Sequence, residues 1–243
     1  MPNPKSDIIR KLENDILPLQ GYKTALGKSA VHVNLGPIND AFPNSHFPVG
    51  AIHEFVCSDM EKQTAASGFI STIISSLMND GGVALWISSS RTIFPSALKS
   101  FGIDPSSIIF IDLKNQKEVA WAVDEAVKLN GLAAVVGEMQ EIDFSISRRL
   151  QLAVEQSQVT GFLLNKKNTM AGSNACLTRW KISSLPSVLD DDLPGVGFPC
   201  WKVDLLKVRN GRPGSWELAW MNGQFTALNM EPVVISDLHQ KTG

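Results

Sequence analysis

Two kinds of hydrophobic pattern alternate along most of the chain. Short apolar runs with the length of doubly buried strands lie at 51–56, 83–88, 108–113, 133–136 and 160–165. Stretches with helical spacing lie between them, at 64–78, 94–101, 118–129 and 145–156. In 118–129 the apolar residues form one stripe that can pack on a sheet. This alternation predicts a doubly wound α/β core, with a mainly parallel sheet and helices on both faces.

The region before this core has a different pattern. A helix is predicted close to the N-terminus, capped by Ser6 and ended by Pro18. Its apolar residues recur at helical spacing and are Ile8, Ile9, Leu12 and Ile16. From 21 to 49 turn residues predominate, so we expect an irregular approach segment with at most a short strand at 31–35.

After Lys166 the apolar runs follow one another without intervening helices. Strands are predicted at 177–183, 201–208 and 216–221. The segment 209–214, RNGRPG, predicts a turn that joins the last two strands into an antiparallel hairpin. We therefore divide the chain into an arm and approach segment at 1–45, a core at 46–225 and a tail at 226–243.

The composition is typical of a folded globular protein, with 44% hydrophobic and 19% charged residues among 243. Lys and Arg total 22 against 24 Asp and Glu, so the overall charge gives no reason to expect strong binding of nucleic acid. The three cysteines, Cys57, Cys176 and Cys200, are odd in number and widely spaced, with no CxxC and no nearby His cluster, which argues against a disulfide framework and a zinc site. We expect no metal and a reducing compartment.

Membrane insertion is not predicted. The longest uncharged stretch, 63–79, is shorter than the roughly 20 apolar residues that a span needs, and polar residues interrupt it. The N-terminal residues MPNPKSD lack the apolar segment of a secretion signal. A cytoplasmic protein is expected.

The first loop between a strand and a helix is the place where a doubly wound sheet binds phosphate. A phosphate loop needs the pattern GxxxxGK[ST], but the sequence here is CSDMEKQT. Cys57 replaces the first Gly, Lys62 the second and Gln63 the Lys, while Thr64 is retained. Lys62 lies one position too early, which turns it about 100° around a helix. We therefore expect no bound nucleotide or other cofactor.

Glu138 is the most prominent acidic candidate. It follows the apolar run at 133–136 after Gly137, close to the position of a carboxylate that supports Mg²⁺ in such folds. The alternative is a structural role in which Glu138 caps a helix or pairs with Arg148 or Arg149. Since the chain contains no GxSxG or HExxH, hydrolase chemistry of those types has no support.

The segments 47–69 and 81–104 together resemble the opening of the RecA core. In that family an approach strand leads into the phosphate loop, and the next strand carries the catalytic glutamate, whose position here falls near Ser89. The resemblance implies a RecA-like fold that lacks this catalytic residue as well.

A closer resemblance is to the ImuA family, RecA-like and SulA-related accessory proteins of damage-induced mutagenesis in bacteria. It rests on the order of GAIHEF (50–55), ALWISSS (84–90), AAVVGEM (133–139), SRRLQLAVEQSQVTGFLL (147–164), TRWKISSLPS (178–187) and RPGSWELAW (212–220). It implies a non-hydrolysing protein that binds RecA and an ImuB-like homologue of Y-family polymerases. That complex acts with a DnaE-type replicase in translesion DNA synthesis, so association with the nucleoid is expected after damage.

The resemblance also suggests contacts for residues outside the phosphate loop. Basic residues cluster in the second half of the chain and could contact DNA or a partner: Lys166, Lys167, Arg179, Lys181, Arg209 and Arg212. Protection of strand edges explains them equally well. Lys166 and Lys167 lie where RecA proteins carry a DNA-contacting loop, which favours weak contact with single-stranded DNA. RecA protomers assemble through an N-terminal helix, so residues 6–17 could support self-association.

Two other functions stay open at this stage. The chain could be a RecA-type ATPase or nucleotide switch, with Thr64, Glu138 and a rebuilt loop around Lys62. It could also be a SulA-like inhibitor of cell division, although SulA-like chains are generally shorter.

Overall fold

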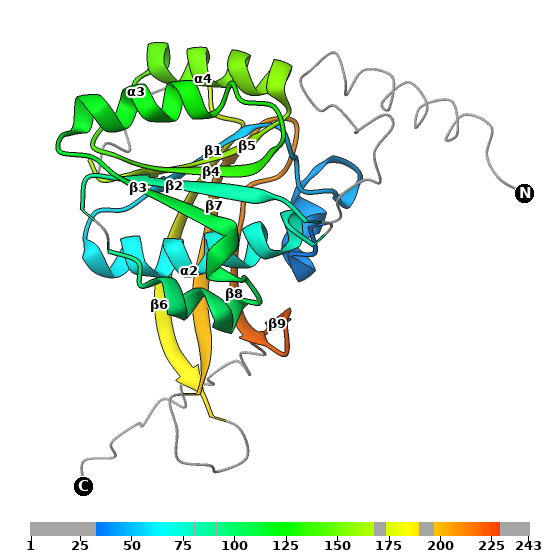
Figure 1. The fold of residues 1–243 in the computed structure, drawn as a ribbon. Coiled ribbons are helices and arrows are strands. Elements are labelled where there is room, and N and C mark those ends of the chain that lie inside the picture. The colour runs from blue at the N-terminus through cyan, green and yellow to red at the C-terminus, as the bar shows by residue number, and fades with distance from the viewer. Residues whose placement is uncertain (1–32, 80, 91, 168–173, 190–196, 229–243) are drawn as a thin grey trace, which may run out of the picture.

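The computed structural model describes residues 33–79, 81–90, 92–167, 174–189 and 197–228 (Figure 1). The helix expected at 6–17 and most of the expected tail lie outside the described residues. The α-helices are α2 (Met60–Leu77), α3 (Gln116–Ala126) and α4 (Phe144–Ser157). The strands are β1 (Ile52–Val56), β2 (Val83–Ser88), β3 (Ile108–Asp112), β4 (Leu132–Met139), β5 (Thr160–Asn165), β6 (Thr178–Val188), β7 (Phe198–Val208), β8 (Gly214–Met221) and β9 (Gln224–Ala227).

All these strands form one sheet, in the order β3-β2-β4-β5-β1-β6-β7-β8-β9. The pairs from β3 through to β6 are parallel, and those from β6 to β9 are antiparallel. Helices lie on both faces of the sheet: α2 on one, α3 and α4 on the other (Figure 1). The predicted fold class, a mainly parallel doubly wound sheet with an antiparallel C-terminal hairpin, is therefore confirmed.

Each face of the sheet has its own hydrophobic core. Under α2 the core is built from large aromatic side chains, among which Phe55 and Trp180 stack with ring centroids 6.0 Å apart. Under α3 and α4 it is aliphatic and includes Val123, Leu150 and Leu163. The strands between the two cores are buried on both sides, which explains their continuous apolar runs.

Several elements differ from the sequence prediction. The segment predicted as a helix at 94–101 is a 3-10 helix, η4 (Pro95–Phe101). Part of the approach segment forms two more, η2 (Gly36–Ala41) and η3 (Pro43–Ser45), and residues 33–35 form no strand. Leu35, Ile38 and Phe42 are buried in the core under α2, so this segment packs as part of the main unit. Strand β9 was not predicted, and it crosses the expected boundary between core and tail.

Within the described ranges, no helix is both long enough and apolar enough to cross a membrane.

Candidate functional site

The candidate site lies where β1, β2, β4 and β5 end and α2 begins. Parallel strands present their carboxyl ends at one edge of a sheet, and this edge is the usual ligand position in such folds. Helix α2 begins at Met60, four residues earlier than the apolar pattern predicted, because Asp59 caps it. Lys62, Gln63 and Thr64 therefore lie in the first turns of the helix and not in an open loop.

The start of α2 is closed by contacts within the chain. The Asp59 carboxylate accepts a hydrogen bond from the Lys62 backbone N–H at 2.8 Å. The Lys62 Nζ turns back and donates to Asp59 and to the Ser58 Oγ. The Ser58 hydroxyl in turn donates to the Asp59 carboxylate at 2.8 Å, and the hydrogen bonds from Lys62 and Ser58 hold the pKa of Asp59 well below its usual range. A carboxylate of the chain thus occupies the anion position at this helix N-terminus.

The side chains of Thr64 and Cys57 are also not available to bind a phosphate. The Thr64 hydroxyl donates to the Met60 carbonyl at 2.9 Å. Cys57 is buried, and burial together with the charges of Asp59 and Glu138 raises the pKa of its thiol to about 12. The thiol is neutral at physiological pH and has little nucleophilic character.

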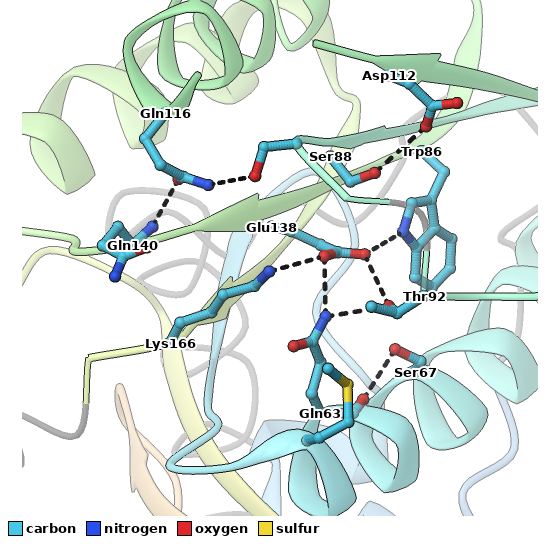
Figure 2. A network of polar contacts seen from close by, with 12 residues as sticks. Gln63, Ser67, Trp86, Ser88, Thr92, Asp112, Gln116, Glu138, Gln140 and Lys166 are labelled. Carbon is cyan, nitrogen blue, oxygen red and sulfur yellow. Dashed lines mark hydrogen bonds and ion pairs between the residues drawn. The ribbon is translucent and has the colours of Figure 1, made fainter. Parts of the chain in front are cut away.

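Glu138 lies inside β4, where its carboxylate is fully buried. Figure 2 shows groups from four other segments that point at it. The Gln63 Nε2 donates at 2.8 Å and the Trp86 Nε1 at 3.0 Å, and the Lys166 Nζ forms an ion pair at 3.1 Å. The Thr92 hydroxyl lies at 3.4 Å. We call Glu138 and these four residues the Glu138 cluster. Each of the four contacts the Glu138 carboxylate through its side chain.

This arrangement corrects the position and the basic partner that the sequence analysis gave to Glu138. Glu138 does not lie in the loop after the strand, because β4 continues to Met139. It also does not pair with the arginines of α4: the Arg149 Nε instead binds Asp124 at 2.7 Å. The carboxylate of Glu138 fixes the ends of β2, β4 and β5 to the start of α2.

A second string of polar contacts lies beside the Glu138 cluster (Figure 2). Gln116, in the first turn of α3, donates to the Ser89 Oγ at 2.8 Å. Its side-chain oxygen accepts from the Gln140 backbone N–H at 2.9 Å. Ser89, the position where the RecA resemblance placed a catalytic glutamate, is thus held by the helix that follows β3.

A further buried carboxylate, Glu54 on β1, was missed by the sequence analysis. It accepts from the Asn165 Nδ2 at 2.8 Å and from the Arg179 Nε at 2.6 Å, and Asn174 donates to it as well. Arg179 is its register partner on β6. A signal was available, because a carboxylate inside an apolar strand needs a cation nearby.

Most of the predicted basic contact residues are engaged within the chain. Lys166 binds Glu138, Lys167 binds Glu141 and Arg179 binds Glu54. Arg209 donates to the Ala175 carbonyl at 3.2 Å. Lys181 is half-buried and Arg212 is exposed. Lys166, Lys167 and Arg179 each have their charge matched by a carboxylate. These three residues therefore do not form one open cationic patch.

Comparison with known proteins identifies relatives over most of the chain. No family model matches it. The protein ImuA of Caulobacter vibrioides, in strains NA1000 / CB15N and ATCC 19089, is 30% identical over 193 residues, which are 74% of this chain and 79% of the relative. The cell division inhibitor SulA of Yersinia pestis (strain Pestoides F) is 25% identical over 130 residues, 53% of this chain and 76% of the relative. The chain therefore belongs to the ImuA family.

Proposed function

We propose that this protein is a catalytically silent accessory of DNA-damage-induced mutagenesis that acts by binding other proteins. Membership of the ImuA family supports the role in mutagenesis. The proposed lack of catalytic activity rests on the closed start of α2. There the Asp59 carboxylate accepts hydrogen bonds from the backbone N–H and from the side-chain Nζ of Lys62. A nucleotide phosphate placed there would meet a carboxylate in place of free N–H groups and a free lysine.

The Glu138 cluster adds to this argument. A carboxylate that supports Mg²⁺ or a reacting water must face the ligand, but Glu138 is fully buried and surrounded by donors of the chain. To bind a metal ion it would have to give up its ion pair with Lys166. A RecA-like fold with this closed site keeps its surfaces for partners while it lacks a nucleotide switch.

The proposed partners are RecA and an ImuB-like homologue of Y-family polymerases, with a DnaE-type replicase engaged indirectly. Biolayer interferometry on each immobilised partner, with and without single-stranded DNA, tests this proposal. Saturable binding to one of them is the expected result. If neither RecA nor the ImuB-like protein binds, the accessory role is wrong.

The rival function, a RecA-type ATPase, has its own test. Steady-state phosphate release is measured for the full chain, with and without single-stranded DNA. We expect release at the level of the buffer blank. If phosphate release rises in proportion to protein concentration and falls with Thr64→Ala, the chain is an ATPase. The proposal that it has no catalytic activity is then refuted.

The similarity to SulA supports a second candidate, inhibition of cell division, over a smaller part of the chain. Light scattering of the assembling cell-division filament protein separates the two candidates. A mutagenesis accessory leaves assembly unchanged, whereas a SulA-like inhibitor suppresses it in a saturable way.

A further inference from the structure

The antiparallel strands β7 and β8 have one face that no described helix covers. Their inward side chains lie in the core under α2 and are Trp201, Val203, Leu205, Leu218 and Trp220. Because successive side chains of a strand point to opposite faces, Cys200, Lys202, Glu217 and Ala219 point away from α2. Helices α3 and α4 lie on that side of the sheet but pack on β1, β2 and β4 (Figure 1). We call the side of β6, β7 and β8 that points away from α2 the outer face.

One row of side chains on the outer face is apolar and buried. Ala219 is 0% exposed, and its register partner Cys200 is 4% exposed. Leu185, the partner of Cys200 on β6, continues the row and is half-buried. In the next row Lys202 is exposed and Glu217 is half-buried, as is usual where water reaches one face of an antiparallel sheet. Cys200 and Ala219 belong to neither hydrophobic core, so their burial requires a cover that the described helices do not provide.

The chain beyond β9 begins close to this row. The Leu228 backbone N–H donates to the Glu217 carbonyl at 2.9 Å, so residues 229–243 start beside β8, one row from Ala219. The row from Ala219 to Leu185 crosses two strand spacings, which is about 10 Å. Five residues of extended chain span about 17 Å. The chain a few residues beyond Leu228 therefore reaches every position of the row.

The sequence beyond β9 contains a segment that suits such a cover. Residues 232–238 read PVVISDL, and the three residues after the proline are β-branched and apolar. Such residues favour an extended backbone, in which Val233 and Ile235 point to the same side. The segment thus has one apolar side, which can pack on the apolar row of the outer face.

Charge does not select a foreign partner for the outer face, whereas attachment favours the chain's own segment. Lys202 is the register partner of Glu217, and Lys181 is that of Asp204, so the rows beside the apolar one carry charges of both signs. They favour neither an acidic nor a basic partner. A short linker holds a tethered segment at a millimolar effective concentration, so contact with a few apolar side chains is enough to keep it in place.

We propose that residues 232–238 of the same chain lie across the outer face and cover the row formed by Leu185, Cys200 and Ala219. The outer face is then a docking surface whose occupant is a tethered segment of the protein itself. The inference does not depend on the proposed function, because no partner protein enters it.

The experiment measures how fast iodoacetamide alkylates each cysteine of the native protein, with peptide mass spectrometry as the readout. It compares the wild type with a chain that ends at Asn229 and with a full chain that carries Val233→Asp and Ile235→Asp. The matched control carries Gln240→Asp and Thr242→Asp, which add the same two charges outside the segment. Cys57 and Cys176 are buried in the cores under α2 and under α3 and α4, so they report any general unfolding.

We expect Cys200 to react at least about tenfold faster in the truncated chain and in the Val233→Asp, Ile235→Asp variant than in the wild type. Cys57 and Cys176 should stay protected, and the control should match the wild type. Rapid alkylation of Cys200 in the wild type, or protection that both variants retain, would overturn the proposal. A wild-type rate that rises on dilution would assign the cover to a second copy and would also overturn it. If truncation exposes all three cysteines, that chain has unfolded, and the full-length variant decides by the same criterion.

Discussion

Glu138 shows how much one buried side chain decides at the scale of the residue. The sequence identified it as the leading acidic candidate, and its position on β4 suggested a ligand. Its role depends on three donors from distant segments, Gln63, Trp86 and Lys166, and no local pattern reports such contacts. Local spacing indicates which residues are unusual, whereas the fold decides what they contact.

The ion pair between Glu138 and Lys166 gives a first prediction. Glu138 is fully buried and Lys166 is 21% exposed. Lys166→Met would leave a buried carboxylate without its cation, so we expect the free energy of unfolding to fall by about 2–4 kcal/mol in urea titrations. Lys167→Met is the control, because its ion pair with Glu141 is half exposed on both sides and should contribute less than about 1 kcal/mol.

The double variant Glu138→Gln with Lys166→Met completes this test. It removes both charges, so it should recover part of the stability that Lys166→Met alone loses. Equal losses for Lys166→Met and Lys167→Met would contradict the role assigned to the Glu138 cluster.

His53 gives a prediction on pH. Burial lowers the pKa of this histidine to about 3, against 6.5 for the unperturbed group. Its Nδ1 contacts the Thr178 Oγ1 and its Nε2 the Pro48 carbonyl, which together suit the neutral ring with its proton on Nε2. Since the unfolded chain binds the proton more readily, stability should be complete above about pH 6.5 and should fall progressively toward pH 3.

Urea unfolding at pH 7 and pH 5.5 measures this effect. The wild type should lose about 1 kcal/mol between the two values, and His53→Gln should lose little of its own remaining stability. The window lies above the range in which carboxylates titrate, so Asp59 and Asp124 do not obscure it. A wild type with the same stability at both values would show that His53 titrates normally.

At the scale of the element, Gly137 is needed for the packing of α3 on β4. From the sequence alone, the same glycine looked like the loss of a metal-binding carboxylate. The sequence placed it where a metal-supporting carboxylate was expected. In the structure α3 crosses β4 so closely that a Cβ on Gly137 would lie 2.5 Å from a methyl carbon of Val123. The glycine therefore permits the contact between helix and strand.

Gly137→Ala should consequently lower the free energy of unfolding by about 1–3 kcal/mol, because the core must shift to admit one methyl group. Val123→Ala creates the space that the new methyl group needs. In a double-mutant cycle, the combination should cost clearly less than the sum of the single variants. Additive losses would show that the close approach of α3 is not the reason for the glycine.

The elements that sequence predicted well share a physical reason. Strands β1, β2 and β5 are buried on both faces, so their apolar runs end where the strands end. Helix α2 was placed too late because its first turn is polar and its start is set by the Asp59 cap. Strand β9 is four residues long and mostly exposed, so its pattern carried almost no signal.

At the scale of the whole molecule, the sheet order explains why the fold was easier to predict than the site. Alternating strands and helices specify a doubly wound sheet, and the later run of strands specifies its antiparallel extension. The site needs side chains from β2, β4, α2 and the residue that follows β5, all at one edge, and their pairing depends on packing across the whole chain. The sequence CSDMEKQT was enough to predict the loss of the phosphate loop. It did not predict the contacts between Asp59 and Lys62 that take the place of a bound phosphate.

The most direct test of this account is a calorimetric titration of the full chain with ATP and Mg²⁺. The closed start of α2 and the Glu138 cluster predict no saturable heat below about 1 mM nucleotide. Saturable binding at micromolar concentration would contradict the account, since it would require Asp59, Lys62 and Lys166 to leave the contacts that they make here.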